Sequence, residues 1–208
     1  MPLQNRVTPF GDIIVTPERG TMLGNRGILH NDQKEIIRAS QVRRWLCCVL
    51  EFKGIRRTIM KPGSYTELFF LDEATALAAG HRPCCECRRQ AYLDFQSHWT
   101  KVFGMKAGAD EMDRMLDHDR KYRGGGKKTY QADISGLPDG TFVAREGQAW
   151  LLHKGRLLQW TPGGYTSGQE RGTGMVEVLT PRATVAILQA GYIPGVHESA
   201  LSAIRQKL

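Results

Sequence analysis

Residues 72–103 constrain the fold most, because two helical patterns meet there at a break that the sequence imposes. Asp72 is a suitable N-cap for a helix over "EATALAA", and Gly80 is a suitable residue to end that helix. A second helix is expected to begin near Cys87, since the apolar residues of "RRQAYLDFQSHWTKVF" recur at helical spacing. The intervening "HRPCCEC" is therefore expected to form a tight turn that leads into the second helix.

This turn carries Cys84 and Cys87 at the C-x-x-C spacing. Two thiolates at that spacing can bind one tetrahedral zinc ion together. The helix N-terminus and the neighbouring Arg82, Arg88 and Arg89 favour the thiolate over the thiol. The pattern also fits a redox pair or two unrelated buried thiols, and the spacing alone leaves these alternatives open.

The rest of the sequence predicts an α+β protein. Residues 45–60 have the pattern of a hairpin, with a turn at Lys53 and Gly54. A third helix is expected over residues 109–122. Beyond residue 136, short apolar stretches alternate with Asp-Gly and Lys-Gly turns, which is typical of strands. We expect the second half to be β-rich.

The glycine-rich "RGGGKK" at residues 123–128 is the best candidate for a linker, because consecutive glycines carry a high backbone entropy cost. It predicts an N-terminal domain over residues 1–122, a linker over 123–136 and a β-rich C-terminal domain over 137–208. The second half is alternatively a β layer that completes a shared core.

Charge and composition bear on partners and location. The chain has 29 Lys and Arg against 21 Asp and Glu, a net charge of +8. Such an excess favours polyanions, although it also fits a basic protein without such a partner. No membrane partner is expected, since the apolar runs are too short to span a bilayer. The first residues turn polar at once, so we expect a cytoplasmic protein, in which clustered cysteines bind metals or react rather than form disulfides.

The segment "ELFFLDEATALAAGHRPCCECRR" resembles the second half of the Ada-type zinc module of bacterial alkylation-repair proteins. The likeness covers about residues 45–90, and an Ada-like module would extend over about 45–105. The resemblance implies a mixed sheet with helices around a zinc-bearing, DNA-contacting module in repair or regulation, with Cys84 and Cys87 as ligands. The chain as a whole also resembles bacterial proteins without an assigned activity, which adds no functional expectation.

The chain departs from this family where the first cysteine pair is expected. Those positions fall near Arg57 and Lys61, which cannot bind zinc. One missing cysteine is the family's methyl acceptor, so phosphotriester repair by that mechanism is not expected. Two further zinc ligands must come from elsewhere, and the candidates are Cys48 in the expected hairpin and His30 in a turn-rich loop. A small buried thiol is the alternative role for Cys48.

Basic residues near the cysteine turn suit phosphate groups, because a forked guanidinium matches phosphate geometry. A solvated surface without a partner is the alternative interpretation. The residues expected to contact nucleic acid are Arg56, Arg57, Lys61, His81, Arg82, Arg88 and Arg89.

Two enzymatic alternatives accompany the DNA-binding hypothesis. Asp110, Asp113 and Asp117 lie on one side of the expected third helix and, with His118, could hold a divalent ion in a nuclease-like site. Acidic helix faces also occur simply as hydrated surfaces. The second alternative is a thiol-redox protein that uses Cys84 and Cys87.

Overall fold

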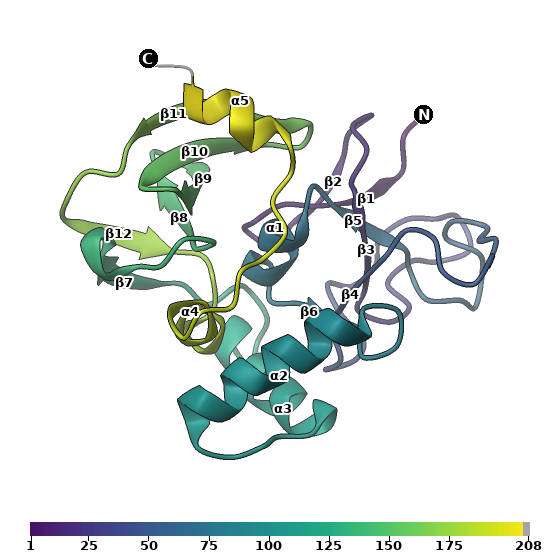
Figure 1. Ribbon diagram of the computed structural model, residues 1–208. Helices are drawn as coiled ribbons and strands as arrows, with labels where there is room; N and C mark the ends of the chain where they lie inside the picture. The colour runs from purple at the N-terminus through teal and green to yellow at the C-terminus, as the bar shows by residue number, and fades with distance from the viewer. Residues whose placement is uncertain (206–208) are drawn as a thin grey trace.

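Two sheets lie on either side of a short central helix, α1, in the computed structural model, which describes residues 1–205 (Figure 1). The helices α2 and α3 pack together beneath the N-terminal sheet and α1 in this view. The fold is thus α+β, as the sequence predicts.

The N-terminal sheet is mixed and has the strand order β2-β1-β5-β3-β4-β6. Two of its pairings are parallel, β1 with β5 and β4 with β6, and the others are antiparallel. One edge of the sheet is the two-residue strand β6, which leads into the turn that carries Cys84 and Cys87. The strands are β1 (Gln4–Val7), β2 (Ile13–Val15), β3 (Met22–Asn25), β4 (Leu46–Cys48), β5 (Leu68–Phe70) and β6 (Arg82–Pro83).

The C-terminal sheet is antiparallel throughout and has the order β11-β10-β9-β8-β12-β7. Strands β8 to β11 form a meander, while β12 inserts between β8 and β7. The strands are β7 (Tyr130–Asp133), β8 (Phe142–Arg145), β9 (Gln148–His153), β10 (Arg156–Thr161), β11 (Gly164–Glu170) and β12 (Met175–Val178), and a 3₁₀ turn, η1 (Ile134–Gly136), follows β7.

The helix α1 (Glu73–Ala78) is buried on all sides, which is typical of a helix enclosed in a core. Ala74 and Ala78 pack against the C-terminal sheet, Ala76 against the N-terminal sheet and Leu77 against the other helices. These helices are α2 (Arg89–Phe103), α3 (Ala109–Arg120) and α4 (Arg182–Gln189), while α5 (Ser199–Arg205) covers the C-terminal sheet.

The ends of α1 are formed as the sequence predicts. The Asp72 carboxylate accepts a hydrogen bond from the N–H of Thr75 over 2.8 Å, which caps the helix N-terminus. Gly80 follows the last helical turn with a φ of 91°, a value that favours glycine. A Cβ at this glycine would also lie 2.7 Å from the Arg120 side chain, so the close approach of α3 requires it as well.

The predicted hairpin over residues 45–60 is wrong. Residues 53 and 54 do form a turn, but residues 55–60 form no strand, and β4 pairs instead with β3 and β6. The segment 123–136 that was expected to be a linker contains β7, which pairs with β12, and the 3₁₀ turn η1. The division into two domains stays a prediction.

Candidate metal centre

Cys48 and Cys84 come together because β4 and β6 pair in parallel. The two strands are in register at Cys47 and Pro83, and the N–H of Cys84 donates to the carbonyl of Cys47 over 2.9 Å. The next residues along the two strands are Cys48 and Cys84. The parallel pairing therefore brings together two thiols that are far apart in the sequence.

The turn that follows β6 returns the third thiol, Cys87, to the same place. The N–H of Arg88 donates to the carbonyl of Cys84 over 3.1 Å, and α2 begins at the next residue, Arg89. The backbone N–H groups of Glu86 and Cys87 also donate to the Cys84 sulfur. The turn thus supplies both a second thiol and hydrogen-bond donors to the first.

The ligand atoms of Cys48, Cys84 and Cys87 all lie within 4.8 Å of one another. Sulfurs on one tetrahedral zinc ion are about 3.8 Å apart, given zinc–sulfur bonds of about 2.3 Å. The three thiols therefore need only a small contraction to share an ion. No fourth His, Cys, Asp or Glu of residues 1–205 joins the group at the same separation.

Hydrogen bonding concentrates negative charge on one sulfur of the cluster. The Cys48 thiol donates to Cys84, and this bond, with those from the backbone of the turn, lowers the pKa of Cys84 to about 5. The same bond, followed by burial, raises the pKa of Cys48. Burial is the main cause that raises the pKa of Cys87. Cys84 is therefore the thiol of this group whose ionisation its surroundings favour most.

Cys47 and Cys85 lie next to the cluster in the sequence but do not belong to it. Cys47 is fully buried, and burial raises the pKa of its thiol to about 12. The Arg88 guanidinium lies 3.5 Å from its sulfur and donates to the Glu73 carboxylate over 2.8 Å. Cys85 is exposed on the outside of the turn.

Glu73 is a buried polar residue that the sequence analysis did not single out. It accepts hydrogen bonds from Arg88, from the Tyr192 hydroxyl over 2.6 Å and from the N–H of Gly195 over 2.9 Å. It therefore connects the residue after Cys87 to the C-terminal half. The sequence signal was a second acidic residue directly after the expected N-cap Asp72, at the start of the apolar-rich helix "EATALAA".

The structure does not bring His30 to the thiols. Its Nδ1 lies 2.6 Å from the Thr66 hydroxyl and its Nε2 lies 3.3 Å from the carbonyl of Lys61. Both ring nitrogens are thus engaged with other groups in a buried position. Of the four predicted ligands, Cys48, Cys84 and Cys87 are brought together and His30 is not.

His81 and Arg82 are buried, so the expectation that they contact nucleic acid is wrong. Arg82 forms a two-pronged ion pair with Asp113, over 2.9 and 2.7 Å, inside the protein. His81 accepts a hydrogen bond from Arg26, and burial, with help from Arg26, lowers its pKa well below the ordinary value. Both residues enter the core because the chain forms β6 there.

The other basic residues near the turn differ in exposure. Arg56, Lys61 and Arg89 are exposed, whereas Arg57 donates to the Tyr65 hydroxyl and to the carbonyl of Leu50. With Arg88 held by Glu73, three of the seven predicted contact residues are free at the surface.

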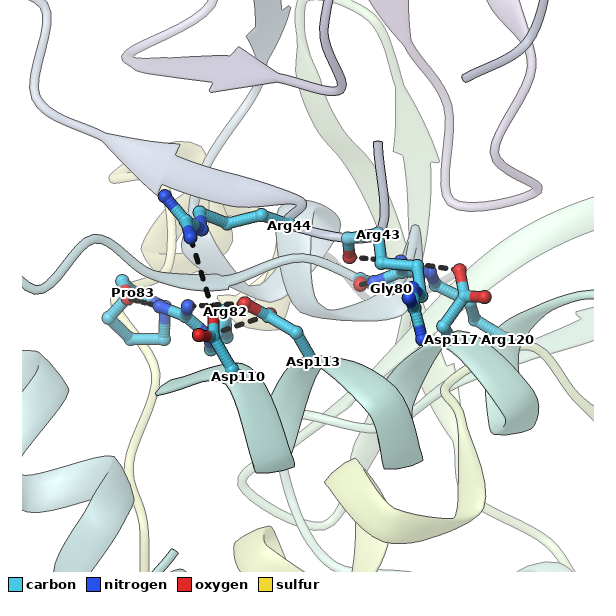
Figure 2. Close-up of polar contacts among 9 residues, drawn as sticks. All are labelled: Arg43, Arg44, Gly80, Arg82, Pro83, Asp110, Asp113, Asp117 and Arg120. Atoms are coloured by element: carbon cyan, nitrogen blue, oxygen red, sulfur yellow. Dashed lines mark hydrogen bonds and ion pairs between the residues drawn. The ribbon is translucent and has the colours of Figure 1, made fainter. Parts of the chain in front are cut away.

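Asp110, Asp113 and Asp117 lie on one side of α3, and Figure 2 shows each of them beside a basic residue. Asp110 pairs with Arg44, Asp113 with Arg82, and Asp117 with Arg120 and Lys121. Arginine and lysine side chains already balance these charges, so these three residues offer no set of free carboxylates for a divalent ion. His118 is exposed on the same helix.

Comparison with known proteins finds no matching family model, no matching curated protein and no matching solved structure. Among the helices of residues 1–205, none combines the length and the apolar character that crossing a membrane requires. The chemistry of the site therefore has to be argued from its own residues.

Proposed function

We propose that this chain binds one zinc ion through Cys48, Cys84 and Cys87 and presents the surface of this zinc-held module to DNA. The observation that carries the proposal is the mutual approach of the three sulfur atoms within 4.8 Å. Thiolates are soft ligands that select zinc over hard cations such as magnesium and calcium. With three protein ligands, the fourth position of a tetrahedral ion is left to water or to another small ligand.

A zinc ion at this position would connect β4 to the turn that starts α2. These elements are otherwise joined at this edge by the short pairing of β4 with the two-residue β6. Binding energy of such a site adds directly to the stability of the fold. The metal is therefore proposed to be structural, holding the cysteine turn and the start of α2 in place.

The DNA-binding part of the proposal rests on the net charge of +8, on the exposed Arg56, Lys61 and Arg89, and on the resemblance of residues 45–90 to the Ada-type module. Exposed arginines contact phosphates without desolvation of a buried charge. The degenerate cysteine pattern assigns no methyl transfer to this module.

Metal analysis of the purified protein tests the zinc site. We expect one zinc per chain, which Cys48→Ser, Cys84→Ser and Cys87→Ser each reduce, and thiolate-to-metal absorption when cobalt(II) replaces zinc. Cys85→Ser is the matched control, because it removes a thiol of the same turn that lies outside the group. The assignment is contradicted if Cys85→Ser loses as much metal as Cys84→Ser. It is also contradicted if the purified protein contains no metal and forms a reversible disulfide, a result that favours the redox alternative.

Anisotropy of a labelled DNA duplex tests the second part separately. We expect the affinity for DNA to fall with added salt and Arg89→Gln to weaken binding. Arg205→Gln is the matched control, because it makes the same charge change at an exposed position of α5, outside the module. Equal losses in the two variants mean that charge alone drives binding. In that case the zinc site stands and the DNA-contacting module does not.

A further inference from the structure

A second site lies where the loop after α3 approaches Arg26, directly after β3, and Trp45, directly before β4. A cavity of about 370 Å³ is enclosed there by the turn at residues 10–12, by Arg26 and Trp45, and by the glycine-rich residues 121–127. Gly125 and Gly126 have φ angles of 92° and 79°, which let this loop reverse and return Lys127 to the cavity. The zinc ligands are not part of its lining.

Arg26 is a buried cation in this cavity without an anionic partner. Its side chain is 1% exposed, its Nε donates to His81 and its Nη1 donates to the carbonyl of Gly11 over 3.1 Å. Its Nη2 has no hydrogen-bond partner, and no carboxylate of residues 1–205 lies within ion-pairing distance. A buried charge in this state is costly unless a ligand completes it.

The Trp45 ring contacts the guanidinium groups of both Arg26 and Arg120. The two guanidinium carbons lie 4.1 and 4.0 Å from the centre of the Trp45 ring. Arg120 binds Asp117 and two carbonyls, but its Nε is buried without a partner. The cavity wall therefore contains a second unsatisfied donor.

The cavity carries an excess of positive charge. Asp117 neutralises part of the charge of Arg120 and Lys121, which leaves Arg26, Arg123 and Lys127 against Asp12 alone. The Lys127 ammonium donates to the carbonyl of Ala78, a neutral partner. Burial, with a further contribution from Arg26, lowers the pKa of Lys127 to about 7. Together with the charge that Asp117 leaves on Arg120 and Lys121, three uncompensated positive charges remain when Lys127 is protonated.

We propose that this cavity binds a phosphate dianion, either free or as the monoester of a nucleotide, through Arg26 and Lys127. A phosphate dianion balances two of these three charges, whereas a carboxylate balances only one. Planar guanidinium groups match phosphate oxygens, and Lys127 supplies an ammonium donor from the loop that follows α3. The volume of about 370 Å³ exceeds what a free phosphate fills, so an attached group can enter.

Isothermal titration of the zinc-loaded, full-length protein tests this site with inorganic phosphate, dAMP and acetate at equal ionic strength. We expect phosphate and dAMP to bind and acetate to bind at least about tenfold more weakly. Tighter binding of dAMP assigns a nucleotide, and equal binding of the two assigns the phosphate group alone. Acetate affinity equal to that of phosphate overturns the proposal.

Arg26→Met and Lys127→Met should each weaken phosphate binding about tenfold or more, because each removes a charged hydrogen bond. Lys128→Met is the matched control, since Lys128 lies outside the lining and donates to the carbonyl of His118. We expect it to change affinity less than about twofold. If Arg26→Met fails to fold, the comparison of Lys127→Met with Lys128→Met decides, and equal effects of these two contradict the proposal.

Discussion

Replacing Asp113 by alanine separates a structural role of the acidic helix from a catalytic one. Asp113 and Arg82 are 4% and 0% exposed at their side chains and are joined by two hydrogen bonds. Removing one partner of a buried ion pair leaves the other charge without compensation and costs about 3–5 kcal/mol. We expect Asp113→Ala to lower the free energy of unfolding by this amount, which is a large share of a typical domain's total of about 5–15 kcal/mol.

Asp110→Ala is the control on the same helix. Its partner Arg44 is 61% exposed and Asp110 itself is 83% exposed, so water screens this pair. Exposed ion pairs contribute about 0–1 kcal/mol. Urea denaturation of zinc-saturated protein should therefore separate the two variants by at least about 2 kcal/mol.

The double variant Arg82→Met, Asp113→Leu tests the cause of the loss. Replacing both members of a buried pair by apolar side chains removes the uncompensated charge, so it should recover much of the stability lost in Asp113→Ala. The reasoning is refuted if Asp113→Ala unfolds within about 1 kcal/mol of the wild type. A stable Asp113→Ala protein that loses a magnesium-dependent nuclease activity would instead assign Asp113 to catalysis.

Three further substitutions test other parts of the structure. The pKa of Lys127 is about 7 in the folded protein and 10.5 in the unfolded chain, so the buried ammonium destabilises the fold most at or below pH 7. Lys127→Met removes this charge and should therefore stabilise the protein most in that range. In phosphate-free urea titrations, the stability of the wild type should rise towards that of the variant between pH 7 and 10.5. Gly24→Ala should cost about 1–3 kcal/mol in thermal unfolding, since its Cβ would lie 2.3 Å from the Phe70 ring, and an unchanged Tm would contradict this packing. Tyr165→Phe removes the buried 2.7 Å hydrogen bond to Asp72 and should cost about 1.5–3 kcal/mol in urea, whereas a neutral effect would mean that the bond contributes nothing net.

The sequence predicted those elements whose signals are local. The N-cap Asp72, the stop at Gly80 and the helix expected over residues 109–122 depend on neighbouring residues. Each is formed, although the helix ends at Arg120. The cysteine turn was also predictable, because C-x-x-C and a helix start lie within one short segment. Cys48 was named as a candidate for the third thiol, but its place beside Cys84 depends on the parallel pairing of β4 with β6.

The failures come from contacts between distant segments. Residues 45–60 have the pattern of a hairpin, but β4 pairs with strands that lie before and after it in the sequence. His81 and Arg82 look exposed as polar residues beside a turn. In the core, however, Arg26 donates a hydrogen bond to His81 and Arg82 donates to Asp113. Lys127 was assigned to a glycine-rich linker, because nothing near it in the sequence indicates that Arg26 shares its cavity.

The burial of α1 on every side also sets an order for folding during synthesis. Ala74 and Ala78 belong to a core cluster whose other members include Phe142, Leu151 and Ala200. When residues 1–120 have left the ribosome, this apolar side of the helix has no partner yet. This apolar side of α1 stays exposed until the strands of the C-terminal sheet and α5 have been synthesised. The N-terminal half therefore cannot complete the packing of α1 before α5 emerges.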